Sequence, residues 1–140
     1  MQAKGPDKNI LVWVGSFIKR KDGKYLFLKR ASKSSWGVGQ WQLPGGKLEW
    51  GETPEQTLKR EIKEETNLNI KILRLISTHT AQIVAKGIQY HVIELIYDCV
   101  YSGKKITLSK EHNDYTWLDA KESLKINLTP ELRELITKIM

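Results

Sequence analysis

The sequence has one cysteine and no long hydrophobic run, and these two shortages limit what the protein can be. Cys99 lacks a second cysteine, so an intrachain disulfide is impossible and a reducing compartment is the simplest setting. The apolar run at residues 10–17 is far too short to cross a bilayer, and the polar residues 1–9 show no signal peptide. We therefore expect a cytoplasmic protein without a membrane span, in which Cys99 is a buried core thiol.

The chain also lacks internal repeats, low-complexity tracts and linkers. Its 140 residues are 40% hydrophobic and 28% charged, which is the composition of a globular protein rather than a disordered one. A chain of this length buries a core without disulfides or a structural metal. We expect residues 1–140 to form one domain with a frayed start over about residues 1–8, as a monomer or a homodimer.

The formal net charge of +7 favours attraction to phosphates, whether on nucleic acid, small nucleotides or a membrane surface. Lysine and arginine are scattered, without a long basic tract or a recognisable nucleic-acid-binding signature. An ordinary solvated surface explains most of them, so a nucleic-acid partner is disfavoured. The acidic residues, in contrast, crowd into one segment: Glu49, Glu52, Glu55, Glu61, Glu64 and Glu65.

The first part of the chain has the pattern of a β-hairpin. Residues 10–19 and 25–30 are rich in apolar side chains, and the Asp-Gly pair at 22–23 favours the positive φ of a tight turn. A polar loop follows at residues 31–40, and such a loop can line a site. Residues 41–46 then predict a short strand that ends in Pro-Gly-Gly.

Helix-start signals coincide just after this strand. Thr53 is a good N-cap, Pro54 suits the first helical position, and Gln56 lies three residues after the cap. These signals predict a helix over Pro54–Thr66. Asn67 comes next, and asparagine commonly adopts the left-handed conformation that closes helices, so the helix should end there.

Further strands and a second helix are predicted after this helix. Residues 68–78 and 89–101 have strand patterns and are separated by a Lys-Gly break at 86–87, and a last short strand covers residues 115–118. Residues 129–130 repeat the N-cap and first-position signals, and apolar residues then recur at helical spacing. The pattern predicts a mixed sheet with helices packed on it, in α+β or α/β/α layers.

Three glutamates of the first helix share one face. Glu61, Glu64 and Glu65 stand at i, i+3 and i+4, and each like-charge pair costs on the order of 0.2–0.5 kcal/mol. Arg60 and Lys63 are neighbours in sequence, but we expect them to point to either side of this strip. A hard divalent cation would convert the repulsion into binding, because Mg²⁺ prefers carboxylate oxygens and commonly shares substrate phosphates.

A solvent-exposed charged face is the ordinary interpretation of three such glutamates. The flanking sequence changes the balance, because residues 43–49 contain a Gly pair that permits close backbone approach, and Glu52 lies at the mouth of the helix. A Gly-containing loop, a further carboxylate and a carboxylate-bearing helix together predict a metal and phosphate site.

The segment Gly46–Leu68 carries a long pattern of fixed spacing. It consists of Gly46, five residues, Glu52, seven residues, then Arg60-Glu61-Ile62-Lys63-Glu64-Glu65, with Asn67 and Leu68 closing it. This pattern resembles the Nudix signature. The family usually has glycine where this chain has Asn67; asparagine also tolerates the left-handed conformation, so this departure affects helix closure slightly and the chemistry very little.

The resemblance implies a fold and a metal site. The order of strands and helices fits the family's α/β/α sandwich, an α/β (α+β) fold with a mixed β-sheet between helices. Mg²⁺ is the implied cofactor, with Mn²⁺ as an alternative. Arg60 is similar to a family arginine that orients carboxylates by hydrogen bonding. The expected metal ligands are Glu61, Glu64 and Glu65, joined by Glu52 and Gly45.

The resemblance also implies hydrolysis of a diphosphate linkage in a nucleotide derivative. This reaction needs cations that neutralise the phosphates and a base that takes the proton of the attacking water. Proteins that resemble this chain often carry an acid shortly before a Tyr-x-Trp strand, which selects Glu111; an ordinary surface loop glutamate is the other interpretation. Glu61 and Glu64 are further candidates for the base. Glu94 is another, although a cross-strand ion pair explains it as well. We expect His112 to be solvent-exposed.

Substrate binding is less well defined by the sequence. Arg30 and Lys47 could meet phosphates as charge-assisted donors, although solvated surface is the commoner role for each. A nucleotide base would stack on aromatic side chains, which supply rigid area. The candidates, any of which could instead be core residues, are Trp36, Trp41, Trp50 and Tyr90.

The branch of the family that this chain resembles most is MutT-like. This predicts a nucleoside triphosphate pyrophosphohydrolase that releases a nucleoside monophosphate and pyrophosphate. Hydrolysis of a nucleoside diphosphate sugar is an alternative, because the same motif would catalyse it. A binding module that senses a nucleotide or RNA without hydrolysis is a third hypothesis, and the complete set of carboxylates argues against it.

Overall fold

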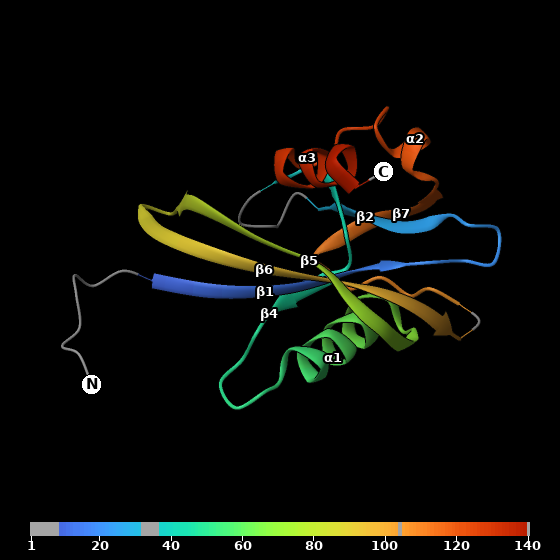
Figure 1. Cartoon of the computed structure of the whole chain (residues 1–140), viewed down its shortest axis with the longest axis horizontal. Helices are drawn as coiled ribbons and strands as arrows, with labels where there is room; N and C mark the ends of the chain where they lie inside the picture. The colour runs from blue at the N-terminus through green and yellow to red at the C-terminus, as the bar shows by residue number, and fades with distance from the viewer. Residues whose placement is uncertain (1–8, 32–36, 104, 140) are drawn as a thin grey trace.

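The computed structural model describes residues 9–31, 37–103 and 105–139. Two β-sheets form the middle of the molecule, with helix α1 (Pro54–Thr66) on one side and helices α2 (Ala120–Ser123) and α3 (Pro130–Ile139) on the other (Figure 1). This arrangement confirms the predicted α/β/α sandwich. Within the described residues, no helix has the length and apolar character needed to cross a membrane.

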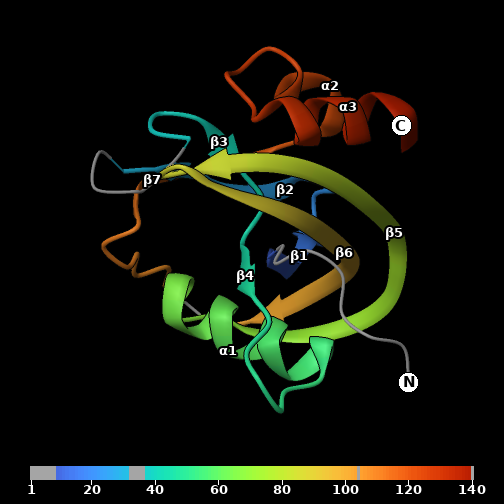
Figure 2. The same ribbon diagram turned by 90° about the vertical axis from the view of Figure 1, so that its left-hand side faces the viewer.

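The larger sheet is mixed, as predicted. Its strand order is β4 (Gly45–Lys47), β1 (Asn9–Ile18), β6 (Ile88–Ser102) and β5 (Asn69–Ala85). Strand β1 pairs in parallel with β6, whereas the other two pairs are antiparallel. Figure 2 shows that β5 and β6 are long and strongly curved, so that they wrap one side of the molecule.

The smaller sheet is antiparallel and has the order β3 (Trp41–Gln42), β2 (Tyr25–Arg30) and β7 (His112–Leu118). The predicted hairpin of the first two strands is therefore wrong. The turn forms, with the Arg20 amide donating to the Lys24 carbonyl, but only an isolated bridge between Lys19 and Tyr25 joins the strands beyond it. Both edges of β1 are already paired, with β4 and β6, so β2 has no edge on which to add.

Strand β4 differs from the prediction because its glycines were expected to end a strand. Gly45–Lys47 instead pairs with β1, opposite Trp13–Gly15. A side chain at Gly45 would collide with the carbonyl oxygen of Val14, so only glycine allows this approach. The Pro-Gly-Gly segment thus carries the chain from the smaller sheet to the larger one.

Helix α1 begins and ends where the sequence predicts. Thr53 and Gln56 form a reciprocal capping box at its N-terminus, and Pro54 occupies the first turn. Asn67 closes the helix in the left-handed conformation, with φ of 67°. Leu58 and Ile62 are fully buried against the sheets, and each contributes roughly 1.5–3 kcal/mol of burial energy.

The rest of the chain follows the predicted order, with changes in length. The break at residues 86–87 is present, but β5 continues to Ala85, and β7 starts three residues earlier than expected. Helix α2 was not predicted. The core has two clusters: Cys99 is buried in the one beside α1, as expected, and Ile136 is buried in the one beside α3.

Candidate active site

A cavity of about 600 Å³ extends from the C-terminal half of α1 to α3, and residues of all four strands of the larger sheet line it. We call the part beside α1 the carboxylate end, defined by Glu61, Glu65, Glu111 and Arg30. We call the part beside β5 and α3 the apolar end. It is defined by Leu11, Trp13, Ile83, Val92, Leu132 and Leu135.

Glu65 is the most deeply buried carboxylate of the site, with 2% of its surface exposed. The amide of Gly45 donates to its Oε1 over 2.9 Å. Burial raises the pKa of Glu65 well above its ordinary value, although this hydrogen bond opposes the shift. A buried carboxylate with one neutral donor is poorly compensated, so this position favours a cation beside it.

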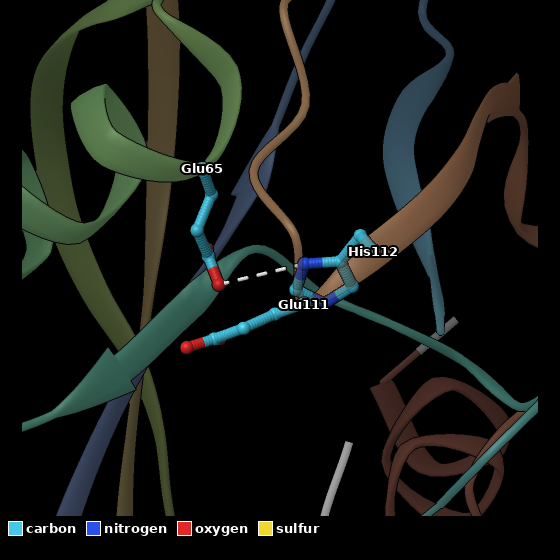
Figure 3. A group of neighbouring side chains, drawn as sticks. All are labelled: Glu65, Glu111 and His112. Atoms are coloured by element: carbon cyan, nitrogen blue, oxygen red, sulfur yellow. Dashed lines mark ion pairs between the residues drawn. The ribbon is translucent and has the colours of Figure 1, made fainter. Parts of the chain in front are cut away.

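Glu111 and His112 lie next to Glu65 although they are far away in sequence. Figure 3 shows Glu65 extending from α1 toward these two residues at the start of β7. Their ligand atoms all lie within 4.8 Å of one another. The carbonyl of Glu111 accepts from the Ala31 amide over 2.8 Å, which anchors the loop to the end of β2. The sequence prediction of Glu111 as a site residue is thus consistent with its position on the cavity wall.

His112 is buried, so the expectation that it is solvent-exposed is wrong. It pairs with Arg30 at the end of β2, a long-range contact that sequence pattern does not reveal. The Gln42 amide nitrogen lies 2.9 Å from His112 Nε2, and since an amide nitrogen only donates, the ring proton is placed on Nδ1. That Nδ1 lies 3.8 Å from Glu65 Oε2.

The charge state of His112 follows from its surroundings. Burial, helped by the charge of Arg30, lowers the pKa of His112 to about 4. The imidazole is therefore neutral near pH 7, and its contact with Glu65 is dipolar rather than an ion pair. No hydrogen-bond partner lies on Nδ1 in the part of the chain that the structure describes.

Arg60 joins the other carboxylates of the motif. Its guanidinium donates to both oxygens of Glu52, over 2.7 and 2.9 Å, and to Glu61 over 3.0 Å. It also lies 3.4 Å from Glu64. The expectation that Arg60 points away from the glutamate strip is therefore wrong, because its long side chain folds back across the start of the helix.

Glu52 is held by Arg60 rather than facing the cavity. Its carboxylate also accepts from the Thr57 hydroxyl over 2.8 Å and from the Glu49 amide over 3.2 Å. The hydrogen bonds from Arg60, followed by that from Thr57, lower the pKa of Glu52 to about 2. Glu52 is not one of the described residues that line the cavity, so its role as a metal ligand stays a prediction.

Glu61 and Glu64 differ in exposure. The Glu61 side chain is 17% exposed and lies over Gly46, where any Cβ atom would collide with its carboxyl group. Burial raises the pKa of Glu61, while Arg60 opposes the shift. The Glu64 side chain is 58% exposed and lies outside the cavity wall in the described part of the chain.

These residues fit a hard divalent cation. The donors are carboxylate oxygens, which Mg²⁺ prefers, and the missing side chain of Gly46 leaves room for Glu61. In the described part of this region, two arginines, Arg30 and Arg60, face a larger number of acids. Those acids are Glu49, Glu52, Glu61, Glu64, Glu65 and Glu111.

The predicted substrate-binding residues divide into two groups. Arg30 and Lys47 line the cavity, and Arg30 is buried at its wall. Burial lowers the pKa of Arg30, while the charges of Glu111 and Glu65 oppose the shift. Trp41 and Tyr90 do not line the cavity among the described residues. Of the other aromatic candidates, Trp50 is fully exposed and is not one of the lining residues, and Trp36 lies outside the described residues.

Among the described residues, the aromatic side chain that lines the cavity is Trp13, which sequence reasoning missed. Its ring lies over Gly15, where a Cβ atom would collide with it. The signal that could have found it is the spacing Trp13-x-Gly15 within a strand, since a glycine beside a large aromatic often marks a close approach. Glu94 lines the same part of the cavity and is half-buried.

Comparison with known proteins settles the family. A family model described as NUDIX domain matches residues 11–139. The chain belongs to the Nudix hydrolase family. Among curated proteins, this Nudix hydrolase is 32% identical to the nucleoside triphosphatase NudI of Escherichia fergusonii over 126 residues, which cover 84% of this chain and 89% of the relative. It is 30% identical to NudI of Escherichia coli over 125 residues, 84% of this chain and 88% of the relative.

Solved structures agree with this assignment. The MutT protein from Methanosarcina mazei superimposes with a TM-score of 0.85 at 25% identity, covering 96% of this chain and 95% of that one. The MutT NUDIX hydrolase from Burkholderia pseudomallei has a TM-score of 0.80 at 28% identity, with coverage of 95% and 100%. The resemblance seen in the sequence is thus confirmed, and the protein is a Nudix pyrophosphohydrolase by family.

Proposed function

We propose that this Nudix hydrolase is a Mg²⁺-dependent nucleoside triphosphate pyrophosphohydrolase that releases a nucleoside monophosphate and pyrophosphate. The observation that carries the proposal is a single cavity with a buried carboxylate group at one end and an apolar, aromatic surface at the other. Its volume of about 600 Å³ lies within the range that holds small-molecule ligands. The name of the NudI relatives, nucleoside triphosphatase, supports the same substrate class.

Glu61, Glu64 and Glu65 would hold the Mg²⁺ ion, with Glu52 and the carbonyl oxygen of Gly45 as further ligands. When bound, the cation supplies neutralisation of the phosphate charges. The chain adds Arg30 to the same end of the cavity, where its guanidinium binds phosphate oxygens as a charge-assisted donor. Lys47, at the rim, adds a second positive charge for the phosphates.

Glu111 is the base that we propose for the attacking water. Its carboxylate faces the cavity from the loop before β7, close to Glu65 (Figure 3). It takes one proton from the water while the water oxygen bonds to a phosphorus of the α–β bridge. The bond from that phosphorus to the bridging oxygen breaks, and the monophosphate and pyrophosphate separate. Glu61 and Glu64 are the alternative bases.

One residue acts through the carboxylates without meeting the substrate. Arg60 holds Glu52 and Glu61 in fixed orientations, so it is a positioning residue that keeps the ligands close despite their repulsion.

We further propose that residues 1–140 act as one catalytic domain in the cytoplasm, with free nucleotides as partners, and that a binding module without turnover is the weaker interpretation.

The test is a panel of nucleoside triphosphates, dinucleotides and nucleotide sugars assayed for phosphate and pyrophosphate with Mg²⁺, with Mn²⁺ and with a chelator. The variant is Glu64→Gln, and the matched control is Glu134→Gln, an exposed glutamate on α3. We expect Mg²⁺-dependent turnover of triphosphates that falls about 1,000-fold in Glu64→Gln and is unchanged in the control. Turnover of nucleotide sugars alone, or no turnover, would refute the proposal.

A further inference from the structure

Glu94 is a carboxylate in the cavity that hydrolysis does not require. It projects from the middle of β6 and lines the cavity near Trp13. The strand register aligns Lys47 of β4, Trp13 of β1, Glu94 of β6 and His79 of β5 in one row across the larger sheet. Residues in register project from the same face of a sheet, so Glu94 stands directly beside the Trp13 side chain.

The surroundings of this row suit a flat, partly apolar group. Leu11, Val92 and Ile83 line the same region of the cavity, and α3 covers it with Leu132 and Leu135. Trp13 provides an aromatic surface, and stacking on such a surface is one of the two ways proteins hold a base outside a duplex. The other way is hydrogen bonding to the edge of the base, for which Glu94 lies in the right place.

The row across the sheet holds charges of both signs. Glu94 and Glu131 are the acidic residues at this end of the cavity, and Lys47 stands on the other side of Trp13 from Glu94. Burial raises the pKa of Glu94, the charge of His79 opposes the shift, and the charge of Glu131 adds to it. Hydrogen-bond donors from a ligand would therefore relieve a carboxylate that its own surroundings compensate poorly.

An ionised carboxylate accepts hydrogen bonds and donates none. Guanine presents two adjacent donors on one edge, N1–H and the N2 amino group, in the same parallel geometry as a guanidinium group. Adenine, cytosine and uracil each place an acceptor beside the donor on the corresponding edge, which a carboxylate repels. We propose that Glu94 accepts N1–H and N2–H of a guanine base stacked on Trp13, and thereby makes guanine nucleotides the preferred substrates.

This inference rests on the proposed function, because it names the substrate class of the same cavity. It differs from two other roles for Glu94. A general base would affect every substrate equally, since it acts on the water rather than on the nucleobase. A structural partner of His79 would change folding stability without changing the ratio between substrates; no ion pair joins the two side chains within the residues described.

The experiment measures kcat/KM for GTP, ITP, ATP, CTP and UTP with the wild-type chain, with Glu94→Gln and with the control Glu134→Gln. ITP is the sharpest probe, because inosine lacks only the N2 amino group of guanosine. We expect GTP to be the best substrate and ITP to be weaker. In Glu94→Gln, kcat/KM for GTP should fall about 10- to 100-fold, whereas UTP should change little, because a hydrogen bond to a charged group is lost.

The same variant should also reduce the difference between GTP and ITP, because glutamine no longer accepts both donors. The Glu134→Gln control should retain the wild-type order of substrates. An equal loss for all five triphosphates would overturn the proposal in favour of a general base, and unchanged ratios would overturn it in favour of a structural role. Melting temperatures of the variants check that each one folds.

Binding of products separates this inference from the proposed function. GMP and UMP are titrated calorimetrically into the wild-type chain and Glu94→Gln without metal. The wild-type chain should bind GMP more tightly than UMP, and Glu94→Gln should lose this preference. That result supports the guanine site even if no triphosphate is hydrolysed; in that case only the proposed function fails. Equal binding of GMP and UMP by the wild-type chain would overturn the guanine site whatever the turnover.

Discussion

The two ends of the cavity are built in different ways. At the carboxylate end, Glu61 and Glu65 belong to one helix, and Arg60 holds Glu61 through a hydrogen bond of 3.0 Å within the same segment. At the apolar end, Trp13, Glu94 and Leu132 come from β1, β6 and α3, so their proximity depends on strand register and on the docking of the last helix.

This difference indicates that hydrolysis and base recognition can be changed separately. Helix α1 fixes the positions of Glu61 and Glu65 relative to each other, and Glu111 joins them from the loop before β7. Side chains on a preformed sheet surface, in contrast, fix which base fits. Residues more than about 7–10 Å apart with no shared partners usually contribute independently to free energy. Substitutions at one end should therefore leave the property set by the other end intact.

The largest effect is expected at the carboxylate end. Glu65→Gln should lower kcat about 1,000-fold or more, because it removes a proposed metal ligand while preserving the shape of the side chain. Saturating Mg²⁺ should raise the melting temperature of the wild-type chain and of Glu94→Gln, but not that of Glu65→Gln, because a ligand that binds only the folded state stabilises it. Steady-state kinetics and thermal unfolding provide the measurements.

The chelated form of the Glu65→Gln variant is its internal control. Without metal, neutralising a buried carboxylate should leave the melting temperature equal to that of the wild-type chain or higher. A variant that unfolds at a much lower temperature would show that Glu65 is chiefly structural, and the contrast between the two ends of the cavity would then fail.

A smaller effect is expected for His112, which contacts Glu65 without reaching the apolar end. His112→Ala should raise the Mg²⁺ concentration needed for half-maximal activity about 10- to 100-fold, because outer partners of metal ligands orient them. The ratio of kcat/KM between GTP and UTP should stay at its wild-type value. The measurement is a Mg²⁺ titration of activity for both nucleotides. A changed ratio of kcat/KM between GTP and UTP, with unchanged Mg²⁺ dependence, would show that His112 acts at the apolar end and contradict this assignment.

The apolar end is tested by removing its aromatic surface. Trp13→Ala should raise KM about tenfold or more while kcat changes less, since stacking contributes roughly 1–3 kcal/mol per base. Trp50→Ala is the matched control, because Trp50 is fully exposed and does not line the cavity in the described region. Equal KM values for the two variants would mean that no base stacks on Trp13.

The smallest effect is expected at the end of α1, where the sequence departs from the usual family pattern. Asn67 has φ of 67°, which glycine adopts freely and alanine does not. Asn67→Gly should leave stability and activity nearly unchanged, whereas Asn67→Ala should lower the free energy of unfolding by about 1–2 kcal/mol. Urea unfolding of both variants measures this, and a large loss of activity in Asn67→Gly would contradict the local role of the residue.

The sequence predicts those parts of the molecule that depend on residues close together in the chain. The capping pair Thr53 and Gln56 and the closing Asn67 determine α1 within a few residues of chain, so its bounds follow directly from the sequence. The carboxylates of the helix were identified for the same reason. The sequence did not predict how deeply each of them is buried, since Glu65 is held by Gly45 of β4, twenty residues away.

Long-range pairing explains what the sequence does not predict. The hairpin prediction failed because β1 pairs with β6, whose residues lie about eighty positions later in the chain. His112 was expected on the surface because nothing near it in sequence reveals that β7 pairs with β2. Trp13 was missed because its exposure to a cavity is a property of three neighbouring strands, not of its own segment.

The most direct test of the account is ³¹P NMR of GTP incubated with the wild-type chain and Mg²⁺. The account predicts equal amounts of GMP and pyrophosphate, formed with Mg²⁺ and abolished by a chelator or by Glu65→Gln. Formation of GDP and inorganic phosphate, or turnover that persists without a divalent cation, would contradict it.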